Sequence, residues 1–169
     1  MSAATASKPK PVINVADIDL QPRPPQMRPT GAAADKYDAR LGLVGPRLGM
    51  RKLGCNVTAV APGKRAFPFH SHRVNEELFF VLQGEGELRY GDTVHTVRAG
   101  DLVACPPGGK ETAHQFVNTG AEELRYLAIS TVEEPDVCEY PDSGKVGVLG
   151  AGMRFLGRED AQPGYWDGE

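Results

Sequence analysis

The chain has 169 residues, a length that suits a single domain of ordinary size with its own hydrophobic core. Lysine and arginine together number 19, against 22 aspartate and glutamate residues, which gives a formal net charge of −3. This acidic balance argues against a nucleic-acid-binding protein, which usually presents a basic face. Hydrophobic residues make up 40% of the chain, enough for a core, but no apolar run approaches the roughly 18 residues of a membrane-spanning helix.

The N-terminal part is expected to lie outside the main domain. Residues 1–11 lack the continuous apolar stretch of a secretory signal, so we expect a cytoplasmic protein. Residues 21–31 hold four prolines and no apolar periodicity, which favours an extended segment. We therefore predict an N-terminal arm over residues 1–40, partly flexible, and a folded domain with a C-terminal extension over residues 41–169.

The remainder of the chain reads as an all-β protein. Twenty glycines and 14 prolines leave little room for helices, because both residues break them. Short apolar or alternating runs separated by Gly- and Pro-containing turns predict strands, which form a β-sandwich or barrel. These runs cover residues 55–60, 77–82, 86–90, 93–97, 102–106, 114–118 and 124–130. Gly91 and Asp92 suit a tight turn that joins two of them into a hairpin.

The C-terminal segment, residues 154–169, has room for a short helical turn. We expect its aromatic residues to dock on the exterior of the barrel.

The three cysteines are expected to be free thiols. Cys55, Cys105 and Cys138 lack the CxxC spacing of zinc or redox sites, and three cannot all pair with one another. Cys105 directly precedes a proline in an apolar strand, which favours a buried structural thiol over a nucleophile. The surroundings of Cys55 and Cys138 in the sequence indicate no role for either.

Three histidines and one glutamate form a candidate metal site. His70 and His72 are two residues apart, so on a strand both imidazoles project from the same face. Glu77 begins the next apolar run, and a turn between the two runs would bring its carboxylate beside the histidines. His114 follows a Gly- and Pro-rich turn further on. Three imidazoles and one carboxylate would hold a divalent transition metal. Glu76 competes with Glu77 as the carboxylate.

These residues resemble the two sequence signatures of the cupin superfamily. The first signature is matched by Gly63, His70, His72, Glu77 and Gly84, with one more residue than usual between the opening glycine and the first histidine. The second is matched by Gly100, Pro106, Gly108, His114 and Asn118, with a longer loop than usual before the last histidine. Six residues lie between Glu77 and Gly84, as the first signature requires between its glutamate and its second glycine, and this spacing favours Glu77 over Glu76.

The resemblance implies a double-stranded β-helix, or jelly-roll barrel. Together with the proline-rich segment, we therefore expect a single cupin domain with an extended N-terminal arm. It also implies a metal at the centre of the barrel, with His70, His72, Glu77 and His114 as its ligands. Small cupins often dimerise through edge strands, and an open β-sandwich benefits from such pairing, so we expect a homodimer. Residues 131–145 and 165–169 more distantly resemble segments of a group of bacterial single-domain cupins, and this likeness indicates no reaction.

Basic residues lie in the loops around the expected ligands although the chain is acidic overall. If at least two of them face the mouth of the barrel, they would favour an anionic ligand such as a carboxylate or a phosphate. The alternative is ordinary solvated loop charge. The residues are Lys64, Arg65, Arg73 and Lys110.

The sequence leaves the function of such a site open between several classes. Fe, Mn, Ni, Zn and Cu all accept these ligands. We expect a metal-dependent cupin that binds and transforms a small polar or anionic molecule, with sugar-phosphate isomerase-like chemistry as one version and an iron-dependent dioxygenase as another. An isomerase needs a general base, for which Tyr126, His95 and Glu87 are available. The rival class is a small-molecule binding or sensing module without turnover.

Overall fold

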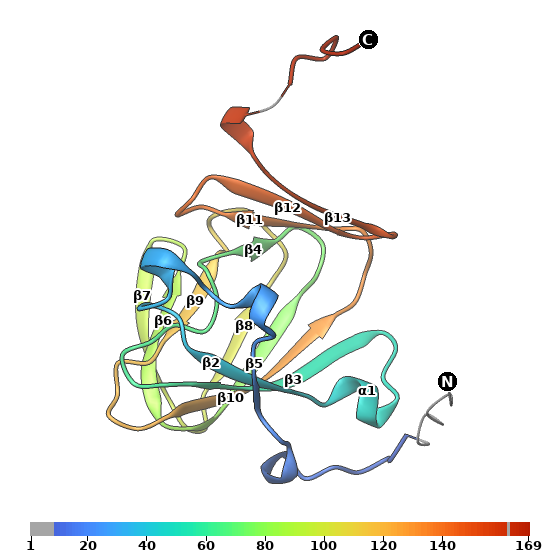
Figure 1. The fold of residues 1–169 in the computed structure, drawn as a ribbon. Helices are drawn as coiled ribbons and strands as arrows, with labels where there is room; N and C mark the ends of the chain where they lie inside the picture. The colour runs from blue at the N-terminus through green and yellow to red at the C-terminus, as the bar shows by residue number, and fades with distance from the viewer. Residues whose placement is uncertain (1–8, 162) are drawn as a thin grey trace.

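Antiparallel β-strands make up most of the regular structure in the computed structural model, which describes residues 9–161 and 163–169 (Figure 1). In chain order the strands are β1 (Gln21–Pro22), β2 (Ala39–Leu43), β3 (Leu53–Val60), β4 (Ser71–His72), β5 (Glu77–Gln83), β6 (Glu85–Tyr90), β7 (Thr93–Arg98), β8 (Leu102–Cys105), β9 (His114–Val117), β10 (Leu124–Thr131), β11 (Asp136–Tyr140), β12 (Lys145–Gly150) and β13 (Met153–Arg158). Helical structure in the described residues is limited to α1 (Gly45–Leu48) and to the 3-10 turns η1 (Val15–Asp17), η2 (Pro25–Met27), η3 (Gly31–Ala33) and η4 (Glu159–Ala161). None of these helices is long and apolar enough to cross a membrane.

The predicted strands are confirmed. Each predicted run coincides with a strand from β3 to β10, and β6 and β7 form the expected hairpin, in which Tyr90 pairs with Thr93. Gly91 in the turn has a φ of 52°, a left-handed conformation that glycine adopts without strain. Along β5, Phe79 and Val81 are buried while Leu78 and Phe80 are exposed, as the alternation of a half-buried strand requires.

Two sheets enclose the main core and form the jelly-roll barrel. The six-stranded sheet has the order β1-β2-β3-β10-β5-β8, and the three-stranded sheet has the order β7-β6-β9. Inward-facing side chains of both sheets fill the space between them, among them Val60, Phe79, Val81, Leu88, Val97, Val103, Phe116, Leu124 and Tyr126. The aromatic members stack: the ring centroids of Phe116 and Tyr126 lie 4.4 Å apart. The fold is therefore the single all-β barrel that the sequence predicted.

A further sheet, with the order β13-β12-β11-β4, joins the C-terminal strands to the barrel (Figure 1). Its connection is the short strand β4, in which His72 pairs with Cys138 and Ser71 pairs with Glu139 of β11. This pairing brings residues 136–140 beside the histidine motif.

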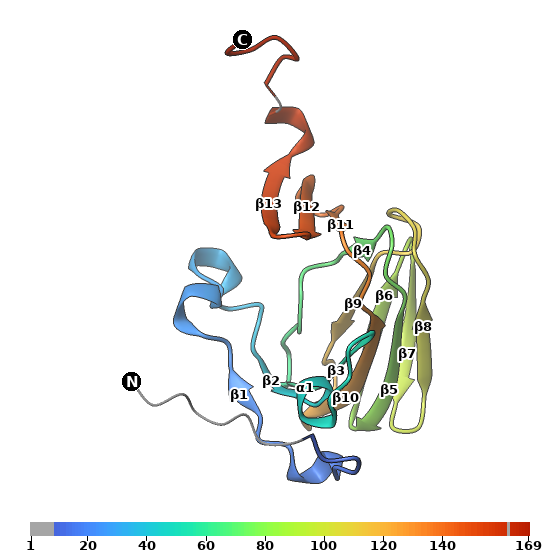
Figure 2. The ribbon, with the colours of Figure 1, turned by 90° about the vertical axis from the view of Figure 1, so that its right-hand side faces the viewer.

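The described part of the N-terminal arm runs along the barrel (Figure 2). Its strand β1 pairs with β2, and β2 starts at Ala39, two residues before the expected start of the domain. Ile18 is 6% exposed and packs in a second apolar cluster with Val44, Cys55 and Val57, which covers the outer face of β3. The arm thus shields part of the six-stranded sheet from water.

The C-terminal aromatics do not dock on the barrel, so that expectation is wrong. Tyr165 is 87% exposed and Trp166 is 77% exposed, and their rings contact each other at 4.8 Å. The hairpin of β12 and β13 carries the chain end away from the barrel, out of reach of its surface (Figures 1 and 2). The short helical turn is present as η4.

All three cysteines are free, as predicted, and Cys105 is buried, as predicted for that residue; Cys55 and Cys138 are buried as well. Burial, together with the nearby Glu77 carboxylate, raises the pKa of Cys105 to about 12, so this thiol stays protonated at neutral pH.

Candidate metal centre

Backbone pairing brings His70 and His114 together. The His114 N–H donates to the His70 carbonyl at 2.8 Å, and the His70 N–H donates to the His114 carbonyl at 3.2 Å. This isolated antiparallel bridge holds the two imidazole centroids 4.7 Å apart. His72 lies two residues on, with its ring centroid 5.1 Å from that of His70. The structure therefore gathers the three predicted histidines into one cluster.

Glu77 completes the cluster from the first position of β5. Its Oε2 lies 2.8 Å from His114 Nε2 and 3.4 Å from His72 Nε2. Ligand atoms of His70, Glu77 and His114 all lie within 4.8 Å of one another. Glu76 is exposed, and its backbone N–H donates to Thr131 Oγ1. The strand alternation thus turns Glu77, rather than its neighbour, toward the imidazoles.

Two atoms at the centre of the cluster are buried and lack a satisfactory partner. Glu77 Oε2 and His114 Nε2 are close but do not form a hydrogen bond, and neither atom has a hydrogen-bond partner elsewhere among the described residues. The other charged contact of Glu77 Oε2 is the one with His72 Nε2 at 3.4 Å. Buried polar atoms of native proteins are almost always satisfied. A carboxylate oxygen and an imidazole nitrogen left in this state fit a site whose missing partner is a cation.

The electrostatics of the cluster follow from its burial and from its mixture of groups. Burial, reinforced by the neighbouring His114, lowers the pKa of His70 to about 4. Burial alone would raise the pKa of Glu77, but the surrounding imidazoles, with His114 first, lower it. His70 is therefore neutral and Glu77 ionised near neutral pH, which are the forms that bind metals.

Asp136 and Cys138 lie behind His72, although the sequence indicates a role for neither. The side chains of His72 and Asp136 meet with Nδ1 and Oδ2 2.5 Å apart, and Asp136 Oδ1 accepts from the Val74 N–H at 3.1 Å. Cys138 Sγ lies 3.4 Å from the same His72 nitrogen. Burial opposes protonation of His72, but the contacts with Cys138, Glu77 and Asp136 outweigh it and raise its pKa to about 9.

This arrangement orients the His72 ring. With Nδ1 directed at Asp136, the other nitrogen, Nε2, is directed toward Glu77. Histidines that bind metals commonly donate their second ring N–H to a carboxylate in this way. Asp136 is 64 residues from His72, so local spacing could not reveal the pair. The sequence holds one signal for this pair: Asp136 and Cys138 are two residues apart, as His70 and His72 are, so on a strand both side chains project from the same face.

The cluster is partly exposed to solvent. His70, His72 and Glu77 are half-buried, whereas His114 is buried. Two aromatic rings flank His70: Tyr140 is stacked at 6.1 Å and Phe67 is tilted at 6.3 Å, both measured between ring centroids. The cluster is therefore not sealed from solvent, and aromatic rings lie beside it.

The basic residues singled out in the sequence have separate environments. Arg73 is exposed and forms an ion pair with Glu139 on β11. The Lys64 ammonium donates to the backbone carbonyl of Asp35 at 2.6 Å. Arg65 is half-buried, with its backbone bridged to Tyr37 and Val117, and Lys110 is exposed.

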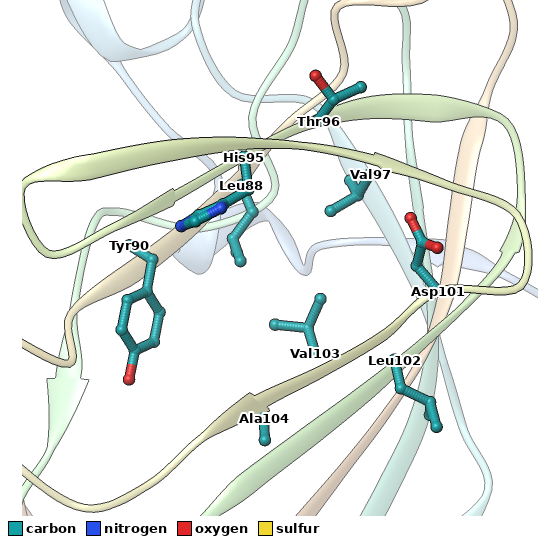
Figure 3. A pocket seen from close by; sticks show the side chains of 9 residues that line it. All are labelled: Leu88, Tyr90, His95, Thr96, Val97, Asp101, Leu102, Val103 and Ala104. Atoms are coloured by element: carbon teal, nitrogen blue, oxygen red, sulfur yellow. The ribbon is translucent and has the colours of Figure 1, made fainter.

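The candidate bases also lie apart from one another. Tyr126 is 1% exposed within the aromatic core, where burial raises the pKa of its phenol. His95 is exposed on β7, with its Nε2 2.9 Å from Thr93 Oγ1, and lines a groove of 360 Å³ between the β6–β7 hairpin and β8 (Figure 3). Glu87 is half-buried on β6. None of these placements selects a general base.

Comparison with known proteins identifies the central part of the chain. Residues 56–130 match the family model of the cupin domain. Auxin-binding protein 1 of Arabidopsis thaliana is 31% identical over 126 residues, which are 70% of this chain and 58% of that protein. The chain spans a little over half the length of the curated relatives that it matches.

Solved structures share the fold over most of the chain. A sugar phosphate isomerase of the cupin superfamily from Silicibacter pomeroyi has a TM-score of 0.76 and 24% identity, and the match covers 93% of this chain and 98% of that one. A candidate sugar phosphate isomerase from Acidithiobacillus ferrooxidans has a TM-score of 0.69 and 27% identity over 75% of this chain and 80% of that one.

Proposed function

This chain is a small cupin-domain protein, and we propose that it holds a divalent transition metal in its barrel and uses that site to bind and transform a small polar or anionic molecule. The observation that carries the proposal is the cluster of His70, His72, Glu77 and His114. Its central atoms, Glu77 Oε2 and His114 Nε2, are buried and have no hydrogen-bond partner in the part of the chain that the structure describes. Fe, Mn, Ni, Zn and Cu all accept imidazole and carboxylate ligands.

Different residues of the chain would bind the metal, orient a ligand and contact the substrate at this site. The three imidazoles and the Glu77 carboxylate would hold the metal, and Asp136 would keep His72 in the correct orientation. When bound, such a metal acts as a Lewis acid that polarises an oxygen atom of the substrate. Phe67 and Tyr140 would flank the substrate beside His70.

Isomerase chemistry on a sugar-phosphate-like substrate is the version with the most support. The candidate sugar phosphate isomerase from Acidithiobacillus ferrooxidans is 27% identical and shares the fold. The partial exposure of His70, His72 and Glu77 supports access of such a substrate to the cluster.

A binding protein without turnover is the second candidate. It is supported by the 31% identity to auxin-binding protein 1, whose name describes the binding of a small molecule. Recovery of a bound compound unchanged after long incubation would favour this version, and its conversion would favour the isomerase.

The metal proposal is tested by substituting each of the two adjacent glutamates separately. We expect Glu77→Gln to lose most of its metal on dialysis, because the variant keeps the size of the side chain but removes the charge beside the imidazoles. The matched control Glu76→Gln, whose side chain is exposed, should retain about one metal ion per chain, as the wild type does. Elemental analysis by inductively coupled plasma mass spectrometry measures the content. Equal metal in both variants would contradict the assignment of Glu77.

The proposal includes a homodimer formed through the outer face of β5 and β8. Leu78, Phe80 and Leu102 are exposed on these strands, and β8 is an edge of the six-stranded sheet. Exposed apolar side chains on a free edge commonly mark an interface. Light scattering at micromolar concentration should give twice the mass of one chain, and Leu102→Glu should shift the mass toward that of the monomer. A wild-type mass of one chain would contradict the dimer.

A further inference from the structure

A cavity lies between the N-terminal arm and the loop that leads into β4, where Figure 2 shows the blue arm beside the green chain. Its volume is 270 Å³. The walls are largely apolar, and one charged side chain lines it, that of Arg23. The lining residues are Arg23, Met27, Pro29, Ala33, Tyr37, Ala66, Phe67 and Pro68. An adjoining cavity of 280 Å³ shares Arg23 and adds Arg28 and Asp38.

The Arg23 side chain is held in place by two contacts and retains unused hydrogen-bond donors. One guanidinium nitrogen, Nη2, donates to the Ala66 carbonyl at 3.0 Å, and the guanidinium carbon lies 4.4 Å from the centroid of the Phe67 ring. A guanidinium has five N–H donors, and this contact uses one of them. The side chain is half-buried, and this burial lowers the pKa of Arg23.

Arg23 has no carboxylate partner among the described side chains, those of residues 9–158, 160–161 and 163–169. Arg40, Arg73, Arg89 and Arg125 all form ion pairs with acidic side chains, whereas Arg23 forms none, even with Asp38 in the adjoining cavity. Removing a cation from water without a counter-charge is unfavourable. The charge is therefore available to an anion that enters the cavity.

The cavity shares its wall with the candidate metal centre. Pro68, a lining residue, accepts a hydrogen bond from His70 Nδ1 through its carbonyl at 2.8 Å. Phe67 contacts both sites: its ring lies under the Arg23 guanidinium and 6.3 Å from the His70 ring. A molecule held by Arg23 would therefore lie next to the residues that position His70.

We propose that this cavity binds the anionic group of a small organic molecule, a carboxylate or a phosphate, with Arg23 as its partner. The planar guanidinium suits the bidentate recognition of either group. The Phe67 ring and the side chains of Met27 and Pro29 would contact the uncharged part of the molecule. The inference rests on the proposed function only in assigning this anion to the molecule handled at the metal centre.

Isothermal titration calorimetry of the metal-free protein tests the site. The probes are benzoate, a carboxylate on an apolar body, and inorganic phosphate. We expect at least one probe to bind the wild type, and Arg23→Ala to weaken it about ten- to hundredfold, the usual effect of losing a charged hydrogen-bond partner. Arg23→Lys, which keeps the charge but loses the planar fork, should lie between them. Binding of benzoate alone identifies a carboxylate, and binding of phosphate alone identifies a phosphate group.

The matched control is Arg98→Ala, which removes an exposed arginine of β7 that lines neither cavity. It should bind the probe as the wild type does. The inference is overturned if neither probe binds the wild type, or if Arg23→Ala and Arg98→Ala bind equally. Circular dichroism checks folding, and Arg23→Lys carries the test if Arg23→Ala unfolds. Metal content is measured separately, so a failure of the metal proposal leaves this result interpretable.

Discussion

Saturation with metal should stabilise the folded chain by about 4 kcal/mol when the free metal is about 1,000 times its dissociation constant. The reason is that the ligands come together only in the native state. His70 and His114 are joined by a bridge between distant segments, and Glu77 belongs to another strand. The unfolded chain offers no comparable site, so the binding free energy adds to the stability of the fold.

The double variant His70→Ala/His114→Ala should show almost none of this stabilisation. Urea denaturation with added Mn²⁺, Ni²⁺ or Zn²⁺, and again with a chelator, measures the difference within each variant. This comparison cancels any direct effect of the substitutions on the metal-free fold. The matched control is His95→Ala, because His95 is exposed and lies outside the cluster. A double variant stabilised as strongly as the wild type would contradict the assignment of the site.

Asp136→Asn should weaken metal binding about 10- to 100-fold, the usual effect of losing the carboxylate behind a metal-binding histidine. In the wild type the carboxylate accepts the Nδ1 proton of His72, so Nε2 is the nitrogen that would bind the metal once it releases the proton that it carries near neutral pH. An asparagine can present its N–H₂ group to Nδ1 instead. The His72 proton would then move to Nε2, where it blocks the lone pair that the metal needs.

Competition with a chromogenic chelator measures the dissociation constant of the metal in each variant. The matched control is Glu139→Gln, which removes a carboxylate from the same strand, β11, that contacts Arg73 instead of His72. An unchanged dissociation constant in Asp136→Asn would show that Asp136 does not position His72. Denaturation of the metal-free Asp136→Asn variant separates weaker metal binding from a general loss of stability. The asparagine would keep an oxygen that accepts from the Val74 N–H.

The sequence could predict the barrel because its strands are locally encoded. Alternating burial along β5 and β10 follows directly from the pattern of apolar residues, and the tight turn at Gly91 requires a residue that tolerates positive φ. The choice of Glu77 over Glu76 came from the spacing to Gly84 in the cupin signature, and the two-residue period of β5 explains it in the structure. Such features depend on neighbours along the chain, which the sequence displays.

By itself, the sequence determined the strands and, through its resemblance to the cupin signatures, the jelly-roll class and the grouping of His70, His72, Glu77 and His114. Only the tertiary structure decided what surrounds this cluster, because those contacts join residues far apart in the chain. Asp136 reaches His72 through the pairing of β4 with β11, and Arg23 reaches Phe67 because the N-terminal arm folds back along the barrel. The exposure of Trp166 was likewise invisible, since it depends on where the last hairpin directs the chain. Local periodicity specifies strands, whereas the pairing of distant strands specifies which side chains meet.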